Sequence, residues 1–221
     1  MFKKLAARLP SRWQTELKRI HFARQINQGA FGTDEPEYVI LDRYVKSGDW
    51  VIDIGANVGH YTKRFSELVG PQGRVIAFEP VPTTFSILAA NVELFAHSNV
   101  SLINAAVSDH LDIVGMEIPD FSTGLANYYR AHLTPGASNS LSVLTLSLNS
   151  LHIDQRLVLV KIDAEGHEAF VMAGMKELIE VHQPVLIVET DSEEVVAGIV
   201  SLGYSQVRMP DSPNVLFTPS E

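Results

Sequence analysis

The chain has 221 residues, of which 46% are hydrophobic and 19% charged, enough for one α/β domain with a sizeable core. It contains no cysteine, which excludes disulfides and cysteine-ligated zinc, and no apolar run reaches the roughly 18 residues of a membrane span. Because the first residues do not lead into the apolar core of a signal peptide, we expect a cytoplasmic protein.

Charge is unevenly distributed along the chain. Up to Arg24 there are seven basic residues and one acid, a charge of +6, whereas the remainder has ten basic and 25 acidic residues, a charge of −15. The acidic body argues against broad binding to nucleic acid, because nothing there would neutralise phosphates. Three roles stay open for the basic start: packing as a lid or homo-oligomer element, contact with an anionic membrane surface, or help in holding an anionic substrate.

Residues 1–32 are predicted to form an amphipathic helical arm, helical over 1–28. Its apolar residues recur at helical spacing: Phe2, Leu5, Leu9, Trp13, Leu17 and Ile20. Pro10 should interrupt the helix, with Ser11 capping the second piece. A polar stretch, 32–35, then precedes a helix predicted at 37–45.

From 33 to 221 we predict one domain in which strands and helices alternate. The predicted strands are 50–54, 74–79, 100–104, 157–163 and 185–189, and the predicted helices are 60–69, 84–95, 167–172, 176–181 and 193–202. Strands that are short and almost continuously apolar are typical of a parallel sheet covered on both faces. With an antiparallel pair at 204–208 and 215–218, the order predicts a doubly wound, mostly parallel α/β sheet, Rossmann-like in kind.

Residues 110–150 interrupt this regular order. They contain two alternating apolar segments, 112–118 and 141–146, and loops with Gly124, Pro135 and Gly136. We interpret the region as a β-rich insertion that shapes the pocket of an acceptor substrate.

The segment 51–59, V-I-D-I-G-A-N-V-G, is the strongest cofactor signal. A strand ends in Asp53, and Gly55, Asn57 and Gly59 then form a loop in which glycines permit a tight turn and close approach of a ligand. The spacing G-x-N-x-G is not the dinucleotide fingerprint G-x-G-x-x-G, which speaks against an NAD(P)-dependent oxidoreductase. A carboxylate here suits a ligand with ammonium and sulfonium groups, such as S-adenosylmethionine.

The ends of the next two predicted strands extend this site. Glu79 ends the second strand, where an acid in a doubly wound fold accepts hydrogen bonds from both ribose hydroxyls. Asn104, or the backbone amides of Ala105 and Ala106, would read the adenine edge at the end of the third strand. An ordinary strand-end turn is the alternative for this last segment.

Three segments together resemble the FkbM family of methyltransferases: Asp53–Thr62, Val75–Pro80 and the K-I-D-x-E-G-x-E motif Lys161–Glu168. The resemblance covers about residues 33–190. It implies a class I methyltransferase fold, S-adenosylmethionine as cofactor, and methyl transfer that is usually to an oxygen of a sugar or polyketide. Asn149 stands where the family often has Asp, which leaves any role of that acid in doubt.

Candidate catalytic residues lie where the fourth strand ends. Asp163, Glu165 and His167 should meet cofactor and acceptor at the carboxyl edge of the sheet. An alcohol acceptor needs a base, for which Asp163 is favoured by topology and His167 by its ordinary pKa. The non-catalytic alternative for His167 is a solvent-exposed histidine at the start of a helix. For Glu165 and Glu168 it is a place in the first helical turn, where the helix dipole favours acids.

A divalent metal held by these side chains is not expected, because no tight ligand spacing demands one. The sequence thus predicts an O-methyltransferase acting on a hydroxyl of a glycan or other small molecule. The alternatives are a non-catalytic cofactor-binding module and an N-methyltransferase of the same fold.

Overall fold

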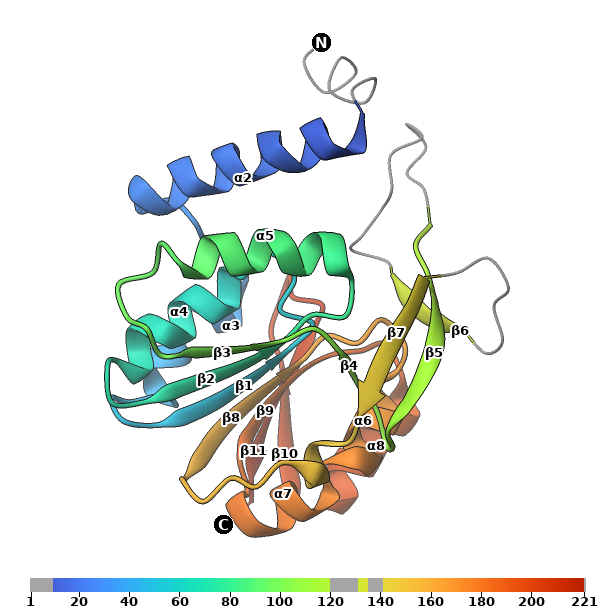
Figure 1. The fold of residues 1–221 in the computed structure, drawn as a ribbon. Coiled ribbons are helices and arrows are strands. Elements are labelled where there is room, and N and C mark those ends of the chain that lie inside the picture. The colour runs from blue at the N-terminus through green and yellow to red at the C-terminus, as the bar shows by residue number, and fades with distance from the viewer. Residues whose placement is uncertain (1–9, 120–130, 135–140, 221) are drawn as a thin grey trace.

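The computed structural model describes residues 10–119, 131–134 and 141–220. Its main sheet has seven strands in the order β10-β11-β9-β8-β1-β2-β3 (Figure 1). In chain order these are β1 (Trp50–Ile54), β2 (Arg74–Phe78), β3 (Val100–Ile103), β8 (Leu157–Ile162), β9 (Val185–Glu189), β10 (Tyr204–Arg208) and β11 (Asn214–Pro219). Five strands are parallel, and β11 is antiparallel to both β9 and β10. The predicted sheet with its antiparallel terminal pair is therefore confirmed.

Helices cover both faces of this sheet (Figure 1). One face carries α3 (Pro36–Val39), α4 (His60–Val69) and α5 (Pro82–Val92), and the other carries α6 (Glu168–Gly174), α7 (Lys176–His182) and α8 (Glu193–Ser201). The single helix predicted at 37–45 is wrong. Ile40, with φ −97° and ψ 6°, ends α3 after one turn, and a 3₁₀ helix, Leu41–Arg43, follows.

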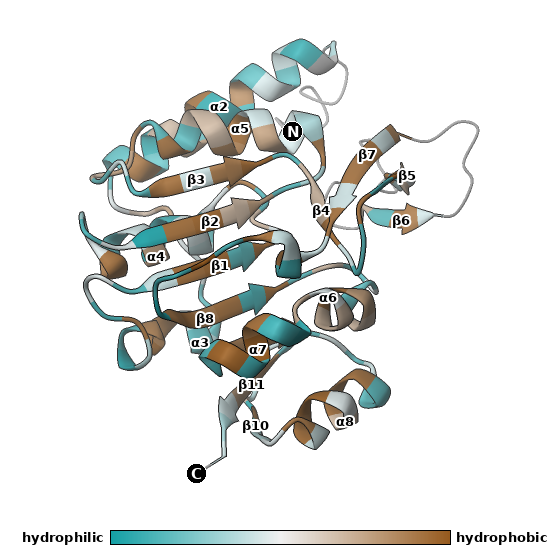
Figure 2. Cartoon of the chain, turned by 60° about the horizontal axis from the view of Figure 1, so that its bottom comes forward, coloured by the Kyte–Doolittle hydropathy of each residue, from teal (hydrophilic) through white to brown (hydrophobic). Residues whose placement is uncertain are grey.

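Strand alternation creates two apolar layers, and Figure 2 shows how hydrophobic these strands are. In β1, Ile52 and Ile54 pack in the layer under α6, α7 and α8, whereas Val51 packs with Phe65 and Val69 of α4. Each fully buried side chain of this size contributes about 1.5–3 kcal/mol. Asp53 shares the side of Val51, so a polar group is placed at the end of an otherwise apolar strand.

The arm helix α2 (Ser11–Asn27) lies across α5 (Figure 1). Phe22 and Ile26 attach it by packing against Phe31, Val58 and Ile87. The helix begins one residue earlier than expected, with Pro10 rather than Ser11 at the N-cap. The predicted apolar positions Phe2, Leu5 and Leu9 lie outside the described residues. Within those residues, no helix is both long and apolar enough to cross a bilayer.

A second, smaller sheet stands beside the carboxyl edge of the main sheet (Figure 1). Its order is β4-β7-β5-β6, with β4 (Ala106–Val107), β5 (Asp112–Glu117), β6 (His132–Thr134) and β7 (Leu141–Leu146). The two alternating segments predicted in the insertion form β5 and β7. The loop residues Gly124, Pro135 and Gly136 lie outside the described residues.

Candidate active site

A cavity of about 330 Å³ opens at the carboxyl edge of the main sheet. Asp53 in β1, Glu79 after β2 and Asp163 after β8 all line it. Backbone hydrogen bonds join the ends of these neighbouring strands: Asp163 N donates to Ile54 O at 3.1 Å, and Gly55 N donates to Phe78 O at 3.0 Å. Three carboxylates that are far apart in the sequence therefore meet at one edge.

The loop after β1 can be built only with glycine at its first turn. Gly55 has φ +73°, and a Cβ there would lie 2.0 Å from the carbonyl oxygen of Asp163. Asn57, at φ +50°, also lines the cavity. Gly59 does not line it: a Cβ at Gly59 would lie 2.7 Å from Leu88 Cδ1, so this glycine lets α4 pack against α5.

Asp53 is fully buried at the bottom of the cavity. Its Oδ2 accepts a hydrogen bond from Thr62 Oγ1 at 2.6 Å, whereas Oδ1 has no partner in the described part of the chain. Burial raises the pKa of Asp53, and the positive charge of Lys161 opposes that rise. A buried carboxylate oxygen without a partner fits a cationic ligand group such as the ammonium of S-adenosylmethionine.

Lys161 lies next to Asp53 across the β1–β8 pairing and is only 4% exposed. Its Nζ donates to Asp163 Oδ2 at 3.2 Å and sits 4.9 Å from the centre of the Tyr61 ring. Burial alone would lower the pKa of Lys161, but the charges of Asp163 and Asp53 raise it. The ammonium is therefore retained; it pairs with Asp163 and stabilises the charged form of Asp53 through space.

Glu79 is 5% exposed and is held by two backbone amides. Val81 N donates to Oε1 and Asn57 N to Oε2, each at 2.9 Å. Burial raises the pKa of Glu79 to about 7, although both amides lower it. A carboxylate has about four lone-pair positions, so acceptor capacity remains for two ribose hydroxyls.

Asn104 and Ala105, which were both predicted to contact the adenine, have different positions at the end of the third strand. Asn104 is exposed and does not line the cavity; its Nδ2 donates to the carbonyl oxygens of Glu79 at 2.8 Å and Pro80 at 3.0 Å. It therefore braces the loop that carries Glu79. Ala105 is buried and does line the cavity.

On the acceptor side, Asp163, Glu165 and His167 all line the cavity, as predicted. Glu165 is exposed with φ +48°, in a tight turn with Gly166 at φ +92°. Glu168 is instead buried at the start of α6, and its Oε1 accepts a hydrogen bond from Gly166 N at 2.9 Å. Glu168 therefore stabilises the turn.

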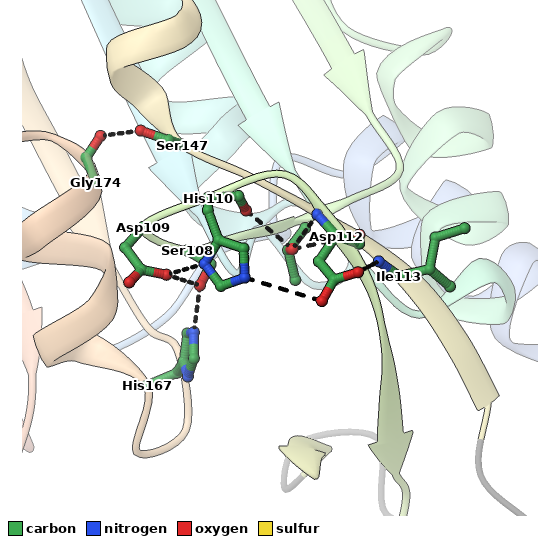
Figure 3. Close-up of polar contacts among 9 residues, drawn as sticks. Ser108, Asp109, His110, Asp112, Ile113, Ser147, His167 and Gly174 are labelled. Atoms are coloured by element: carbon green, nitrogen blue, oxygen red, sulfur yellow. Dashed lines mark hydrogen bonds and ion pairs between the residues drawn. The ribbon is translucent and has the colours of Figure 1, made fainter. Parts of the chain in front are cut away.

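His167 precedes α6, and its ring is held on two sides. Nε2 lies 2.9 Å from Ser108 Oγ (Figure 3), and the ring stacks on Phe170 with centroids 4.5 Å apart. Burial lowers the pKa of His167, with the charge of Asp109 opposing. The imidazole is therefore neutral at pH 7 and able to accept a proton.

Several lining residues were not predicted. Tyr61 donates its hydroxyl to Glu37 Oε1 at 3.1 Å and also to Glu35, which lines the cavity from the segment before α3. Burial and the charge of Asp163 raise the pKa of Glu189 to about 7. Glu189 is the last residue of β9, and Asp53 lies one residue before the end of β1, so the same strand-end signal could have found Glu189. No such signal marks Glu35.

Part of the cavity wall comes from the smaller sheet. Met116, His132 and Leu133 line the cavity there, and Met116 packs with Val81 and Val143 in a small apolar cluster. This side of the cavity is therefore largely apolar. That the inserted strands shape an acceptor pocket stays a prediction.

Asn149 lies away from the cavity, in a 3₁₀ helix, Leu148–Ser150. Its Oδ1 accepts a hydrogen bond from Glu177 N at 3.2 Å, at the start of α7. Either an amide or a carboxylate oxygen can make that bond. Among the residues that the structure describes, no group of three or more His, Asp or Glu side chains is arranged to hold a metal.

Comparison with known proteins identifies the family. The methyltransferase FkbM domain matches residues 53–204. Methyltransferase 1 of Beauveria bassiana is 33% identical over 147 residues, covering 58% of this chain and 59% of that protein. Protein-L-isoaspartate O-methyltransferase 1 of Arabidopsis thaliana is 34% identical over 59 residues, covering 27% of this chain and 26% of that protein. The chain thus spans well under two thirds of both relatives.

Among solved structures, the FkbM methyltransferase of Methylobacillus flagellatus KT superposes with a TM-score of 0.56 at 15% identity. The match covers 77% of this chain and 43% of that one, and it shows a shared fold. The cofactor of the family is S-adenosylmethionine, which suits the buried acids Asp53 and Glu79. The chain belongs to the FkbM family of methyltransferases.

Proposed function

We propose that the protein is an S-adenosylmethionine-dependent O-methyltransferase that acts on a hydroxyl group of a sugar, glycan or other small molecule. One observation carries the proposal: the cavity joins two chemically different sides. Buried carboxylates at Asp53 and Glu79 line one side, and a neutral histidine with an apolar wall lines the other.

The cofactor side follows from the charges and the free acceptor positions. When bound, S-adenosylmethionine supplies a methyl carbon activated by a sulfonium. Asp53 would accept hydrogen bonds from its ammonium group, and Glu79 from its two ribose hydroxyls. Gly55 lets the loop pack directly against the strand end that carries Asp163, and Ala105 lines the cavity where its small side chain would face the adenine.

On the acceptor side, His167 would remove the hydroxyl proton. Its pKa is lowered, so the ring is unprotonated at pH 7 and already competent as a base. Asp163 is bound to Lys161, which suits it to orient the acceptor rather than to carry a proton. Both side chains line the same cavity, so one acceptor can reach them together.

The charge around the site favours oxygen over nitrogen as the methylated atom. Glu35, Asp163 and Glu189 line the same cavity as His167. Nearby carboxylates stabilise the protonated form of an amine, which has no lone pair for attack. A hydroxyl acceptor suffers no such penalty and gains from a neutral base.

Calorimetry with S-adenosylhomocysteine tests the cofactor site first. Asp53→Asn and Glu79→Gln each replace a carboxyl acceptor by an amide, so affinity at pH 8 should fall about 10- to 100-fold, the equivalent of roughly 1.5–3 kcal/mol. Glu93→Gln, an exposed acid after α5, is the control and should bind normally. If the wild-type protein shows no heat of binding with S-adenosylhomocysteine, the proposal is wrong.

Turnover tests the acceptor side. Release of S-adenosylhomocysteine is measured with monosaccharides, methyl glycosides and amino sugars, and the products are located by mass spectrometry. His167→Gln should keep cofactor affinity and lose about 10²- to 10⁴-fold in kcat. A product methylated only on nitrogen contradicts O-methylation.

A further inference from the structure

A line of polar contacts leads from His167 in the cavity to the surface (Figure 3). His167 Nε2 lies 2.9 Å from Ser108 Oγ, Ser108 Oγ lies 3.1 Å from Asp109 Oδ1, and Asp109 Oδ1 lies 2.6 Å from His110 Nδ1. Exposure rises from Ser108 outwards. Ser108 is 3% exposed, whereas the side chains of Asp109 and His110 are 37% and 64% exposed.

Tight backbone packing fixes the distance across this line. Ser108 follows β4, and its N–H donates to Leu146 O at 2.8 Å. A Cβ at Gly174, the last residue of α6, would lie 2.0 Å from the carbonyl oxygen of Ser108. Because α6 touches the Ser108 backbone directly and His167 immediately precedes α6, the hydroxyl and the imidazole are held together by the fold.

The direction of the hydrogen bonds follows from the donors available. Ser108 has one hydroxyl proton, and its two neighbours are a carboxylate and an imidazole nitrogen. The hydrogen bond from His110 lowers the pKa of Asp109, which keeps that carboxylate ionised and the stronger acceptor. The hydroxyl therefore donates to Asp109, and its oxygen accepts a hydrogen bond from the Nε2–H of His167.

That arrangement leaves Nδ1 of His167 unprotonated. None of the residues that the structure describes gives Nδ1 a hydrogen bond, and His167 lines the cavity. We propose that Ser108 and Asp109 are positioning residues, which hold His167 as the Nε2–H tautomer so that Nδ1 takes the acceptor proton; this rests on the proposed O-methylation. As the new C–O bond forms and the C–S bond breaks, the hydroxyl proton moves to Nδ1. The Asp109 carboxylate then stabilises the resulting imidazolium through Ser108.

Nitrogen-15 spectra of histidine rings test the tautomer without any acceptor. Protonated and unprotonated ring nitrogens give well-separated signals, and His167→Gln identifies the His167 pair. At pH 8 the ligand-free wild-type chain should show Nε2 protonated and Nδ1 bare. Ser108→Ala should give a mixture of tautomers, and Ser108→Thr should restore the wild-type pattern.

Ser147→Ala is the matched control, because it removes a neighbouring hydrogen bond, from Ser147 Oγ to Gly174 O, without touching His167. A wild-type His167 protonated at Nδ1, or identical tautomers in wild type and Ser108→Ala, overturns the proposal. With a sugar acceptor that the wild-type chain methylates, Ser108→Ala should lower kcat about tenfold with unchanged affinity for S-adenosylhomocysteine. Full turnover in His167→Gln would instead refute the base assigned in the proposed function.

A separate observation concerns the outer side of α2. Trp13, Leu17 and Ile20 follow one another at helical spacing and are 54%, 46% and 66% exposed, on the side away from Phe22 and Ile26. Exposed basic side chains on the same helix are Arg12 and Arg24, whereas Lys18 lies one turn before Phe22 on the inner side, where burial lowers its pKa. The Arg12 guanidinium lies 6.0 Å from the Trp13 ring centre.

Size and charge indicate what covers the stripe. A whole aromatic side chain has about 150–250 Å² of surface, so these three partly exposed side chains offer roughly 300 Å². A stable protein interface needs about 800 Å² from each partner. We infer that α2 binds an anionic lipid surface, with the apolar stripe shallowly inserted and the basic residues against the headgroups. The acidic remainder of the chain, at −15, would be repelled and so would face away.

Vesicle co-sedimentation tests this inference on the full chain. Phosphatidylcholine vesicles containing phosphatidylglycerol should bind the protein at least tenfold better than phosphatidylcholine alone, and salt should weaken binding. The triple variant Trp13→Ala, Leu17→Ala, Ile20→Ala should lose binding. The control Val181→Ala, Val207→Ala, which removes exposed apolar groups elsewhere, should not. Equal binding to both vesicle types, or a stripe that instead drives dimerisation by light scattering, refutes it.

Discussion

Gly55→Ala tests the close approach between the glycine loop and the strand end that carries Asp163. Two costs arise from the structure. The φ of +73° disfavours any residue with a Cβ by about 1–2 kcal/mol, and a Cβ 2.0 Å from a backbone oxygen forces a displacement worth about 1–3 kcal/mol. The free energy of unfolding should therefore fall by about 2–5 kcal/mol. Affinity for S-adenosylhomocysteine should also fall, because the displaced loop connects Asp53 with Asn57 on the cofactor side of the cavity.

Gly48→Ala is the matched control for the first cost alone. Its φ is +91°, and in the described ranges no atom lies within 4 Å of the added Cβ, so we expect a loss of only about 1–2 kcal/mol and normal ligand affinity. Urea unfolding followed by tryptophan fluorescence gives the free energy of unfolding of each variant. If the two variants are equally destabilised and Gly55→Ala still binds the ligand, the contact with Asp163 does not constrain the loop.

Three further predictions concern buried charges and one exposed helix. Lys161→Met leaves Asp53 and Asp163 without their cation, so the free energy of unfolding should fall by about 3–5 kcal/mol at pH 8. The loss should be smaller at acidic pH, because burial raises the pKa of Asp53 and a protonated carboxyl needs no cation; equal losses in urea at both pH values would contradict this. Glu79 has a pKa of about 7 in the folded chain against an ordinary 4.5, so its contribution to stability is complete below pH 4.5 and is lost as the pH rises to about 7. Thermal melts across that window should show wild type losing about 3 kcal/mol relative to Glu79→Gln, at about 1.4 kcal/mol per pKa unit, and parallel curves would refute it. Gly198→Ala, exposed in α8 with room for its Cβ in the described part of the chain, should raise the unfolding free energy by about 1 kcal/mol, measured in urea; a loss of stability would show that the site is crowded.

The main sheet was predictable because its signals are local. The strands 50–54, 185–189 and 204–208 and the helix 60–69 were predicted with the bounds that the structure shows. Each is a run of apolar or amphipathic periodicity between turn residues such as Gly48 and Gly70. The same logic placed acids at strand ends, and it brought Asp53, Glu79 and Asp163 to one cavity.

The features that were missed depend on contacts between distant residues. Gly59 lies in a sequence that is typical of a ligand-binding loop, but Leu88 packs against it, so the glycine serves helix packing instead. Asn104 stands at a strand end like the acids, yet its amide is occupied by two carbonyl groups. Whether Ser108 meets His167 depends on α6 packing against the Ser108 backbone at Gly174, which no local pattern reports. Local sequence thus predicts where functional groups are presented, and tertiary packing decides which way they point.

The division into two sheets separates two evolutionary tasks. The strands that carry Asp53, Glu79 and Asp163 belong to the seven-stranded sheet, whereas Met116 and Leu133 come from a sheet with its own hydrogen-bonding partners. Residues of β5 and β6 can therefore be exchanged without disturbing the strand pairing that holds the acids in place. We therefore expect chimeras that swap β5–β7 between family members to transfer acceptor preference as one unit while binding of S-adenosylmethionine is retained.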